Sequence, residues 1–149
     1  MKRVKTIETL LIEDNPAESR IITEILSEEA QWININIVKD GEEAMGYLHK
    51  KGKYKNRKTP SLIILDLNLP KKKGMEVLEE IKNDDILKCI PVVVLTISSD
   101  ENDISESYLH HASAYITKPV DLDKFRKNIY TFKNYWFNNA VLPERTYKP

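Results

Sequence analysis

The chain has 149 residues, of which 41% are hydrophobic and 31% charged, a composition typical of one folded domain with a buried core. Its 23 basic and 23 acidic residues give a formal net charge of zero, which argues against general nucleic-acid binding. No apolar run reaches the ~18 residues that a membrane span needs. The basic N-terminus lacks the apolar region of a secretory signal, and the single Cys89 excludes an intramolecular disulfide, so we expect a cytoplasmic protein.

Short apolar runs alternate with amphipathic stretches from the first residues onward. The first strand is predicted over residues 7–13, and Asn15 followed by Pro16 marks the start of a helix. Isoleucine alternates with asparagine over residues 33–37, which predicts a half-buried strand at the edge of a sheet. A short helix then carries the chain toward a third strand.

Three more strand–helix units complete the pattern. The remaining strands are predicted over residues 61–66, 91–96 and 114–117, with helices that begin near Gly74, Asp100 and Asp121. Five such units predict a flavodoxin-like three-layer α/β/α sandwich with a five-stranded parallel sheet in the order 2-1-3-4-5. We expect a single domain with its core at about residues 6–137, a C-terminal extension over residues 138–149, and no second, DNA-binding domain.

Acidic residues stand where two of the predicted strands end. Asp66 follows the aliphatic run 62–65, and Glu13 and Asp14 follow the first strand. Ligands bind at the carboxyl ends of the strands in such sheets, and the two strands are expected to be neighbours. Converging carboxylates repel one another unless a cation neutralises them, and Mg²⁺ suits oxygen ligands. The backbone carbonyl of Asn68 can supply a further ligand.

A hydroxyl and an amine end the other two strands. Thr96 ends the fourth strand and Lys118 the fifth, and together they can hold a phosphoryl oxygen. Each position also has an ordinary explanation, because one of Glu13 and Asp14 can cap a helix and a threonine or lysine at a strand end is common. The joint pattern is what favours a metal-assisted phosphate site.

The motif resembles the receiver domain of two-component response regulators. The matching residues are Glu13-Asp14, Asp66-Leu67-Asn68-Leu69-Pro70, Gly74, Thr96 and Lys118-Pro119. Within that family the chain looks most like the single-domain type associated with phytochrome kinases. The closer likeness is carried by Glu13-Asp14-Asn15-Pro16, by an extended basic loop before the third strand, and by Asn68-Leu69-Pro70-Lys71-Lys72.

The resemblance implies a phosphorelay mechanism. Asp66 would take a phosphoryl group from a histidine kinase, and Glu13 and Asp14 would bind Mg²⁺ together with Asp66 and the carbonyl of Asn68. Lys118 would stabilise the developing charge. Such a protein is a signalling switch and catalyses only its own phosphorylation and dephosphorylation.

The same resemblance implies a conformational switch. Thr96 would hydrogen-bond the new phosphoryl group and draw its loop inward, and Tyr115 would rotate inward and change a protein-interaction surface. Ile97 departs from the family, which usually has a small residue there, and would narrow access to the site if it points toward its mouth.

Three other functions share parts of this pattern. A haloacid-dehalogenase-type aspartyl phosphatase needs a second aspartate two residues after the nucleophile, where this chain has Asn68. A flavin-binding flavodoxin needs a phosphate-binding loop after the first strand, but that loop is acidic here. A degenerate receiver that acts only as a scaffold is disfavoured because all five site positions are present.

Aromatic and large aliphatic residues concentrate near the C-terminus. One set has helical spacing and is predicted to pack on the sheet: Leu122, Phe125, Ile129, Phe132 and Trp136. A second set falls on another face or beyond the helix: Tyr130, Phe137, Val141 and Leu142. We expect this second set to form a homodimer or kinase contact.

Two clusters of basic residues fall in predicted loops. The basic loop, residues 49–60, contains six lysines or arginines, and Lys71, Lys72 and Lys73 follow the third strand. The simpler interpretation is that both are solvated, and the alternative is a docking surface that attracts an acidic partner. We expect no direct nucleic-acid or membrane contact, because no recognition pattern accompanies the lysines.

Overall fold

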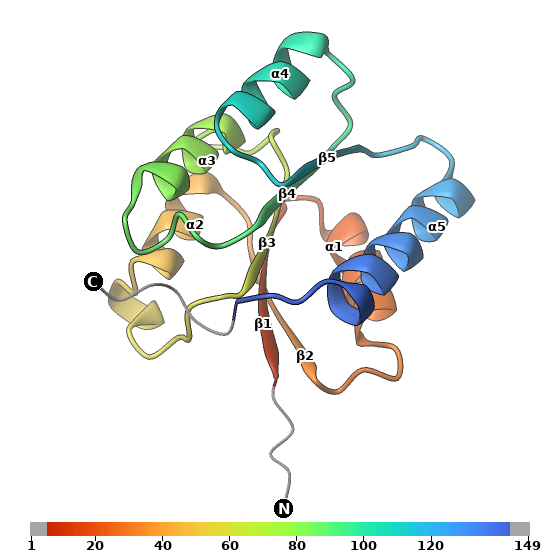
Figure 1. Ribbon diagram of the computed structural model, residues 1–149, viewed down its shortest axis with the longest axis horizontal. Helices are drawn as coiled ribbons and strands as arrows, with labels where there is room; N and C mark the ends of the chain where they lie inside the picture. The colour runs from red at the N-terminus through yellow and green to blue at the C-terminus, as the bar shows by residue number, and fades with distance from the viewer. Residues whose placement is uncertain (1–5, 144–149) are drawn as a thin grey trace, which may run out of the picture.

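Five parallel strands form one sheet in the order β2-β1-β3-β4-β5, which confirms the predicted fold class (Figure 1). The computed structural model describes residues 6–143, so the last six residues of the expected C-terminal extension lie outside the described residues. The strands are β1 (Ile7–Ile12), β2 (Ile33–Val38), β3 (Leu62–Leu65), β4 (Val92–Thr96) and β5 (Ala114–Thr117).

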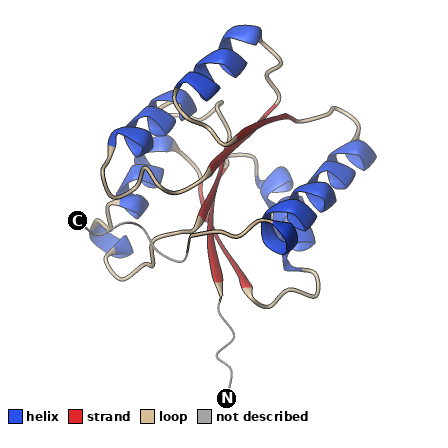
Figure 2. Ribbon diagram, in the orientation of Figure 1, coloured by secondary structure: helices blue, strands red, loops and turns tan. Residues whose placement is uncertain are grey.

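Helices cover both faces of this sheet (Figure 2). They are α1 (Pro16–Ser27), α2 (Gly41–Leu48), α3 (Gly74–Asn83), α4 (Glu101–Leu109) and α5 (Leu122–Lys133), with a short 3₁₀ turn η1 (Gly52–Tyr54) and a π-helical end η2 (Asn134–Asn139). α1 and α5 lie on one face, and α2, α3 and α4 on the other. None of the helices in the described part of the chain is long and apolar enough to cross a bilayer.

The local sequence explains these elements. Every residue of β3 and β4 is buried, as expected for central strands covered on both faces. Asn15 caps α1 by accepting a hydrogen bond from the backbone N–H of Glu18, and Pro16 occupies the first helical position. Asp100 and Asp121 cap α4 and α5 in the same way, so the predicted helix starts are confirmed.

Gly74 fixes the loop that follows β3. A Cβ atom at this position would lie 2.4 Å from the carbonyl oxygen of Asp66 and 2.5 Å from Cα of Leu67. The backbone N–H of Gly74 also donates to the carbonyl of Leu67 (3.1 Å). The close approach of α3 to this loop therefore requires glycine.

The end of the last helix contains a π-helical turn. In η2 the backbone N–H of Ala140 donates to the carbonyl of Tyr135, five residues earlier, at 2.7 Å. A π turn holds more residues than an α turn, so the residue that faces the core changes. Phe137 is 6% exposed in consequence, whereas Trp136 is only half-buried.

The prediction that Phe137 is an exposed interface residue is therefore wrong. Its ring packs edge-on against Trp32 and against Phe132, with centroids 6.2 Å apart in each pair. Leu142 is half-buried against the same core cluster. Of the expected interface set, Tyr130 and Val141 remain exposed, at 43% and 98%.

Candidate functional site

Backbone hydrogen bonds align the four strand ends that carry the predicted site residues. The N–H of Glu13 donates to Val38 and that of Asp66 donates to Ile12, each at 3.0 Å, directly after β1 and β3. The N–H of Lys118 donates to the carbonyl of Thr96 at 2.7 Å. The pairing of the sheet thus brings Glu13, Asp66, Thr96 and Lys118 to one edge, as the sequence predicts.

The ammonium group of Lys118 lies among three carboxylates. Its Nζ is 2.5 Å from Oε1 of Glu13, 2.6 Å from Oε2 of Glu18 and 3.0 Å from Oδ2 of Asp66. Lys118, Glu13 and Asp66 are 5%, 2% and 6% exposed, so most of this ion cluster is shielded from water. One positive charge faces three acids, which leaves an excess of acidic groups.

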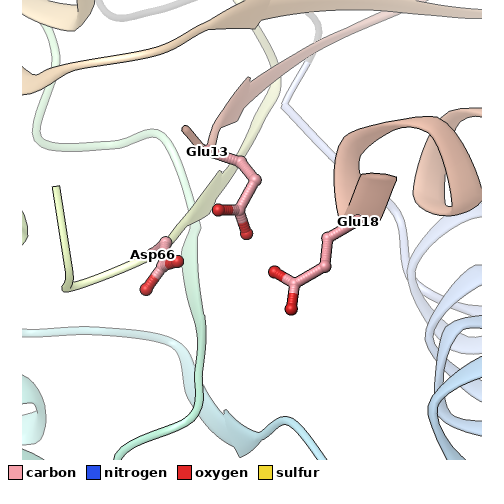
Figure 3. A group of neighbouring side chains, drawn as sticks. All are labelled: Glu13, Glu18 and Asp66. Carbon is pink, nitrogen blue, oxygen red and sulfur yellow. The ribbon is translucent and has the colours of Figure 1, made fainter. Parts of the chain in front are cut away.

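Glu18 is the site residue that the sequence reasoning missed (Figure 3). It lies in the first turn of α1, three residues after the N-cap Asn15. At this position a glutamate often turns back to the N-cap N–H, but here Oε2 of Glu13 accepts that hydrogen bond at 3.2 Å. The carboxylate of Glu18 is therefore available to Lys118. The available sequence signal was an acidic residue in the first turn of a helix that begins shortly after the end of β1.

Asp14 and Asn68, the other two predicted metal ligands, lie outside the cluster of carboxylates around Lys118. Asp14 is exposed, and it is not in the group of Glu13, Glu18 and Asp66 whose oxygens lie within 4.8 Å of one another. The backbone N–H of Asn68 donates to Oδ1 of Asp66 at 3.0 Å. Asn68 therefore orients the Asp66 carboxylate.

Burial dominates the electrostatics of the acids. It raises the pKa of Glu13 to about 8, against the lowering effect of the hydrogen bond from Lys118, and the neighbouring Asp66 raises it further. Burial also opposes the charge of Lys118, but hydrogen bonds to Glu13 and Glu18 outweigh it and raise the lysine pKa. Within the described residues, the single ammonium of Lys118 thus does not balance the three carboxylates that it contacts. Three convergent carboxylates are oxygen donors that suit a divalent cation.

The site has two sides. The charged side is the cluster around Lys118, and the hydroxyl side is formed by Thr96 at the end of β4. Thr96 is fully buried, and its Oγ1 has no hydrogen-bond partner among residues 6–143. The hydroxyl of Tyr115 donates to the carbonyl of Ser98, in the loop after β4, at 2.8 Å. Burial raises the pKa of this phenol. Tyr115 is thus already linked to the loop that follows Thr96.

Known proteins share this fold and this sequence pattern. The family model for the response regulator receiver domain matches residues 9–130. Response regulator Rcp1 of Synechocystis is 44% identical over 134 residues, which are 90% of this chain and 91% of Rcp1.

Two crystal structures support the same assignment. The phosphorylated cyanobacterial phytochrome response regulator RcpA is 46% identical, with a TM-score of 0.89 over 93% of this chain and 99% of RcpA. The Mn²⁺-bound form of Rcp1 is 43% identical, with a TM-score of 0.90 over 92% of this chain and 99% of that structure. With its strand order and the cluster at its strand ends, the chain belongs to the family of response regulator receiver domains.

Proposed function

We propose that Asp66 accepts a phosphoryl group from the phosphohistidine of a histidine kinase. An oxygen of the carboxylate attacks phosphorus, the new O–P bond forms, and the N–P bond breaks with its electron pair left on the imidazole. The observation that carries this proposal is a buried aspartate that lies 3.0 Å from the ammonium of Lys118. Phosphoryl transfer requires mainly positioning and charge stabilisation, which such a pair supplies.

The acids around Asp66 suit a divalent cation, which we propose is Mg²⁺. Glu13, Asp14 and Asp66 would hold it with the carbonyl of Asn68, and Glu18 is a further candidate because its carboxylate lies in the same cluster. When bound, the cation would neutralise the excess negative charge of the site and of the incoming phosphoryl group.

Lys118 is proposed to exchange partners during the reaction. Its ammonium is shared among three carboxylates before transfer, and an oxygen of the phosphoryl group on Asp66 would become the stronger acceptor. Glu18 is the most exposed of these acids, with 28% of its side chain accessible, so it can move away with the least loss of packing.

The hydroxyl of Thr96 is proposed to donate to the same phosphoryl group. Its movement would shift the loop that carries Ser98, whose carbonyl holds the hydroxyl of Tyr115. Phosphorylation is thereby proposed to change the surface around α4, β5 and α5, where protein partners would sense it.

The proposed kinase is of the phytochrome type, on the strength of the similarity to Rcp1 and RcpA. A homodimer through α5 and the following segment also stays a proposal, now restricted to Tyr130 and Val141. The cytoplasmic location expected from the sequence stays a prediction, as does a catalytic role limited to the chain's own phosphorylation and dephosphorylation.

The deciding experiment is incubation with acetyl phosphate and Mg²⁺, followed by intact-mass measurement. We expect one phosphoryl adduct on the native chain and none on Asp66→Asn. An adduct on both proteins would contradict the assignment of Asp66. No adduct on either, with acetyl phosphate or with a phosphorylated histidine kinase domain, would favour the degenerate scaffold.

A further inference from the structure

The basic loop (residues 49–60) is an ordered surface rather than a loose connection. It joins α2 to β3 and so lies at the amino ends of the strands, opposite the carboxyl ends where Asp66 lies (Figure 1). Backbone hydrogen bonds run from Lys51 to Gly46 (2.9 Å), from Tyr54 to Lys51 (3.0 Å) and from Arg57 to Tyr54 (3.1 Å). These bonds fold the loop around η1.

Tyr54 anchors the loop to the protein body. Its ring packs on the buried Tyr47 with centroids 5.1 Å apart, and its hydroxyl donates to the carboxylate of Glu43. Burial and the neighbouring Glu43 raise the pKa of this phenol to about 12, so it stays a hydrogen-bond donor. The aromatic ring faces the core, and the loop therefore presents its cations to solvent.

The cations of this loop lack acidic partners within the described structure. Six side chains are exposed, and none forms an ion pair with a carboxylate of residues 6–143: Lys50, Lys51, Lys53, Lys55, Arg57 and Lys58. The second basic cluster differs, because Lys71 pairs with Asp40 at 3.7 Å and Lys72 pairs with Glu80. The two clusters look alike in sequence. In the described structure, two lysines of the second cluster pair with carboxylates, and no cation of the basic loop does.

Charge balance indicates what can bind there. The loop holds six cations and no acid, so the rest of this neutral chain carries six more acidic than basic residues. A long polyanion such as a nucleic acid would extend from the loop onto that acidic remainder and be repelled. The loop also offers no exposed aromatic ring for base stacking and no large aliphatic side chain to enter a membrane.

We propose that the basic loop is a docking surface for a short, acidic segment of a partner protein. Because backbone hydrogen bonds already order this loop, its backbone loses little conformational entropy on binding, which favours affinity. Because the loop and Asp66 lie at opposite ends of the strands, the partner can be held while the phosphoacceptor stays accessible. This proposal does not depend on phosphorylation of Asp66.

The test measures binding of a fluorescein-labelled ten-residue glutamate peptide to the full chain by fluorescence anisotropy. The triple variant Lys51→Gln, Lys55→Gln, Lys58→Gln should weaken binding about tenfold at low salt, because several exposed charges act together. The matched control is Lys88→Gln, Lys124→Gln, Lys127→Gln, which removes the same charge from exposed lysines elsewhere. The control should bind as the native chain does.

Competing probes decide the class of partner. Single-stranded oligonucleotide of equal charge and phosphatidylserine vesicles should bind the native chain more weakly than the peptide does. Equal peptide affinity of the native chain and the loop variant would overturn the proposal, and so would equal weakening in both variants. Tighter binding of oligonucleotide or vesicles would also overturn it. Labelling of the loop variant by acetyl phosphate at the native rate would show that its fold and phosphoacceptor site are intact.

Discussion

On the β1 and β3 side of the site, the ammonium of Lys118 contacts three carboxylates, whereas on the β4 side the buried hydroxyl of Thr96 has no partner in the described structure. Within residues 6–143, the fold therefore assembles the charged side, whereas the hydroxyl of Thr96 keeps an unused donor. A buried hydroxyl without a hydrogen bond costs about 1–3 kcal/mol. An acceptor beside Thr96 would remove that cost, and under the proposed function this acceptor is an oxygen of the phosphoryl group on Asp66.

The largest expected effect comes from removing the cation of the charged side. Lys118→Met should slow phosphorylation by acetyl phosphate about 10²–10³-fold, because a buried charge that stabilises the transition state is lost. The measurement is a time course of intact mass, with the exposed Lys124→Met as the control. Native labelling rates in Lys118→Met would mean that the charged side does not serve the reaction.

The pH dependence of stability tests the excess of acid on the charged side. The native pKa of Glu13 is raised from 4.5 to about 8, so between these values the folded chain binds more protons than the unfolded chain. The free energy of unfolding should then fall as pH rises from 5 to 8 without divalent cation. We expect Tm to fall by several degrees, since a loss of 1 kcal/mol in the free energy of unfolding lowers Tm by about 2–4 °C in a domain of about this size.

Added Mg²⁺ should reverse this loss. It would replace the proton of Glu13, so its stabilising effect on Tm should be larger at pH 8 than at pH 6. Differential scanning calorimetry at both values, with and without Mg²⁺, measures the difference. Glu13→Gln should flatten the metal-free profile, and an unchanged slope in this variant would assign the pH dependence to other groups.

A smaller effect is expected from the residue that the sequence reasoning missed. Glu18→Gln removes one acid from the charged side while Lys118 keeps Glu13 and Asp66, and Mg²⁺ affinity should fall about fivefold, as for one partly exposed charge. Titration calorimetry measures the affinity directly. Glu24→Gln, on the same helix but paired with Arg20 at the surface, is the matched control. Equal affinities in the two variants would remove Glu18 from the metal site.

The hydroxyl side should respond in two opposite directions. Thr96→Val removes a buried hydroxyl that has no partner within residues 6–143, so the unphosphorylated chain should gain about 1 kcal/mol in the free energy of unfolding. The phosphorylated chain should lose stabilisation, because the phosphoryl group then lacks a donor. Chemical denaturation of both forms measures these changes, with Thr96→Ser as the control that keeps the hydroxyl. A destabilised unphosphorylated Thr96→Val would mean that the native hydroxyl already has a partner.

The smallest effect is expected at the mouth of the site. Ile97 follows Thr96 and is 65% exposed. Ile97→Ala should be labelled faster by acetyl phosphate because the isoleucine side chain narrows access for a small phosphodonor, whereas transfer from a kinase should change less. Equal labelling rates would show that Ile97 leaves the site open.

Hydrophobic periodicity was sufficient to predict a five-stranded parallel sheet with helices on both faces, because strands buried on both faces and strong helix caps leave few alternatives. The strand order came from the flavodoxin-like fold class. The same periodicity also placed Glu13, Asp66, Thr96 and Lys118, since parallel strands end at one edge. Glu18 was missed because the direction of its side chain depends on which carboxylate accepts the N–H of the N-cap Asn15, and here that carboxylate belongs to Glu13. Phe137 was assigned to the wrong environment because a regular period of 3.6 residues does not anticipate a π turn.

The π turn at the end of α5 also determines what intrinsic fluorescence can report. The chain has two tryptophans, Trp32 and Trp136, and both pack against the core cluster beneath α1 and α5. Trp32 contacts Phe137, which the π turn brings inward, so indole emission should follow the docking of this helix end. Neither indole belongs to the cluster around Asp66. Tryptophan emission is therefore suited to monitoring C-terminal unfolding, and cation binding needs a separate probe.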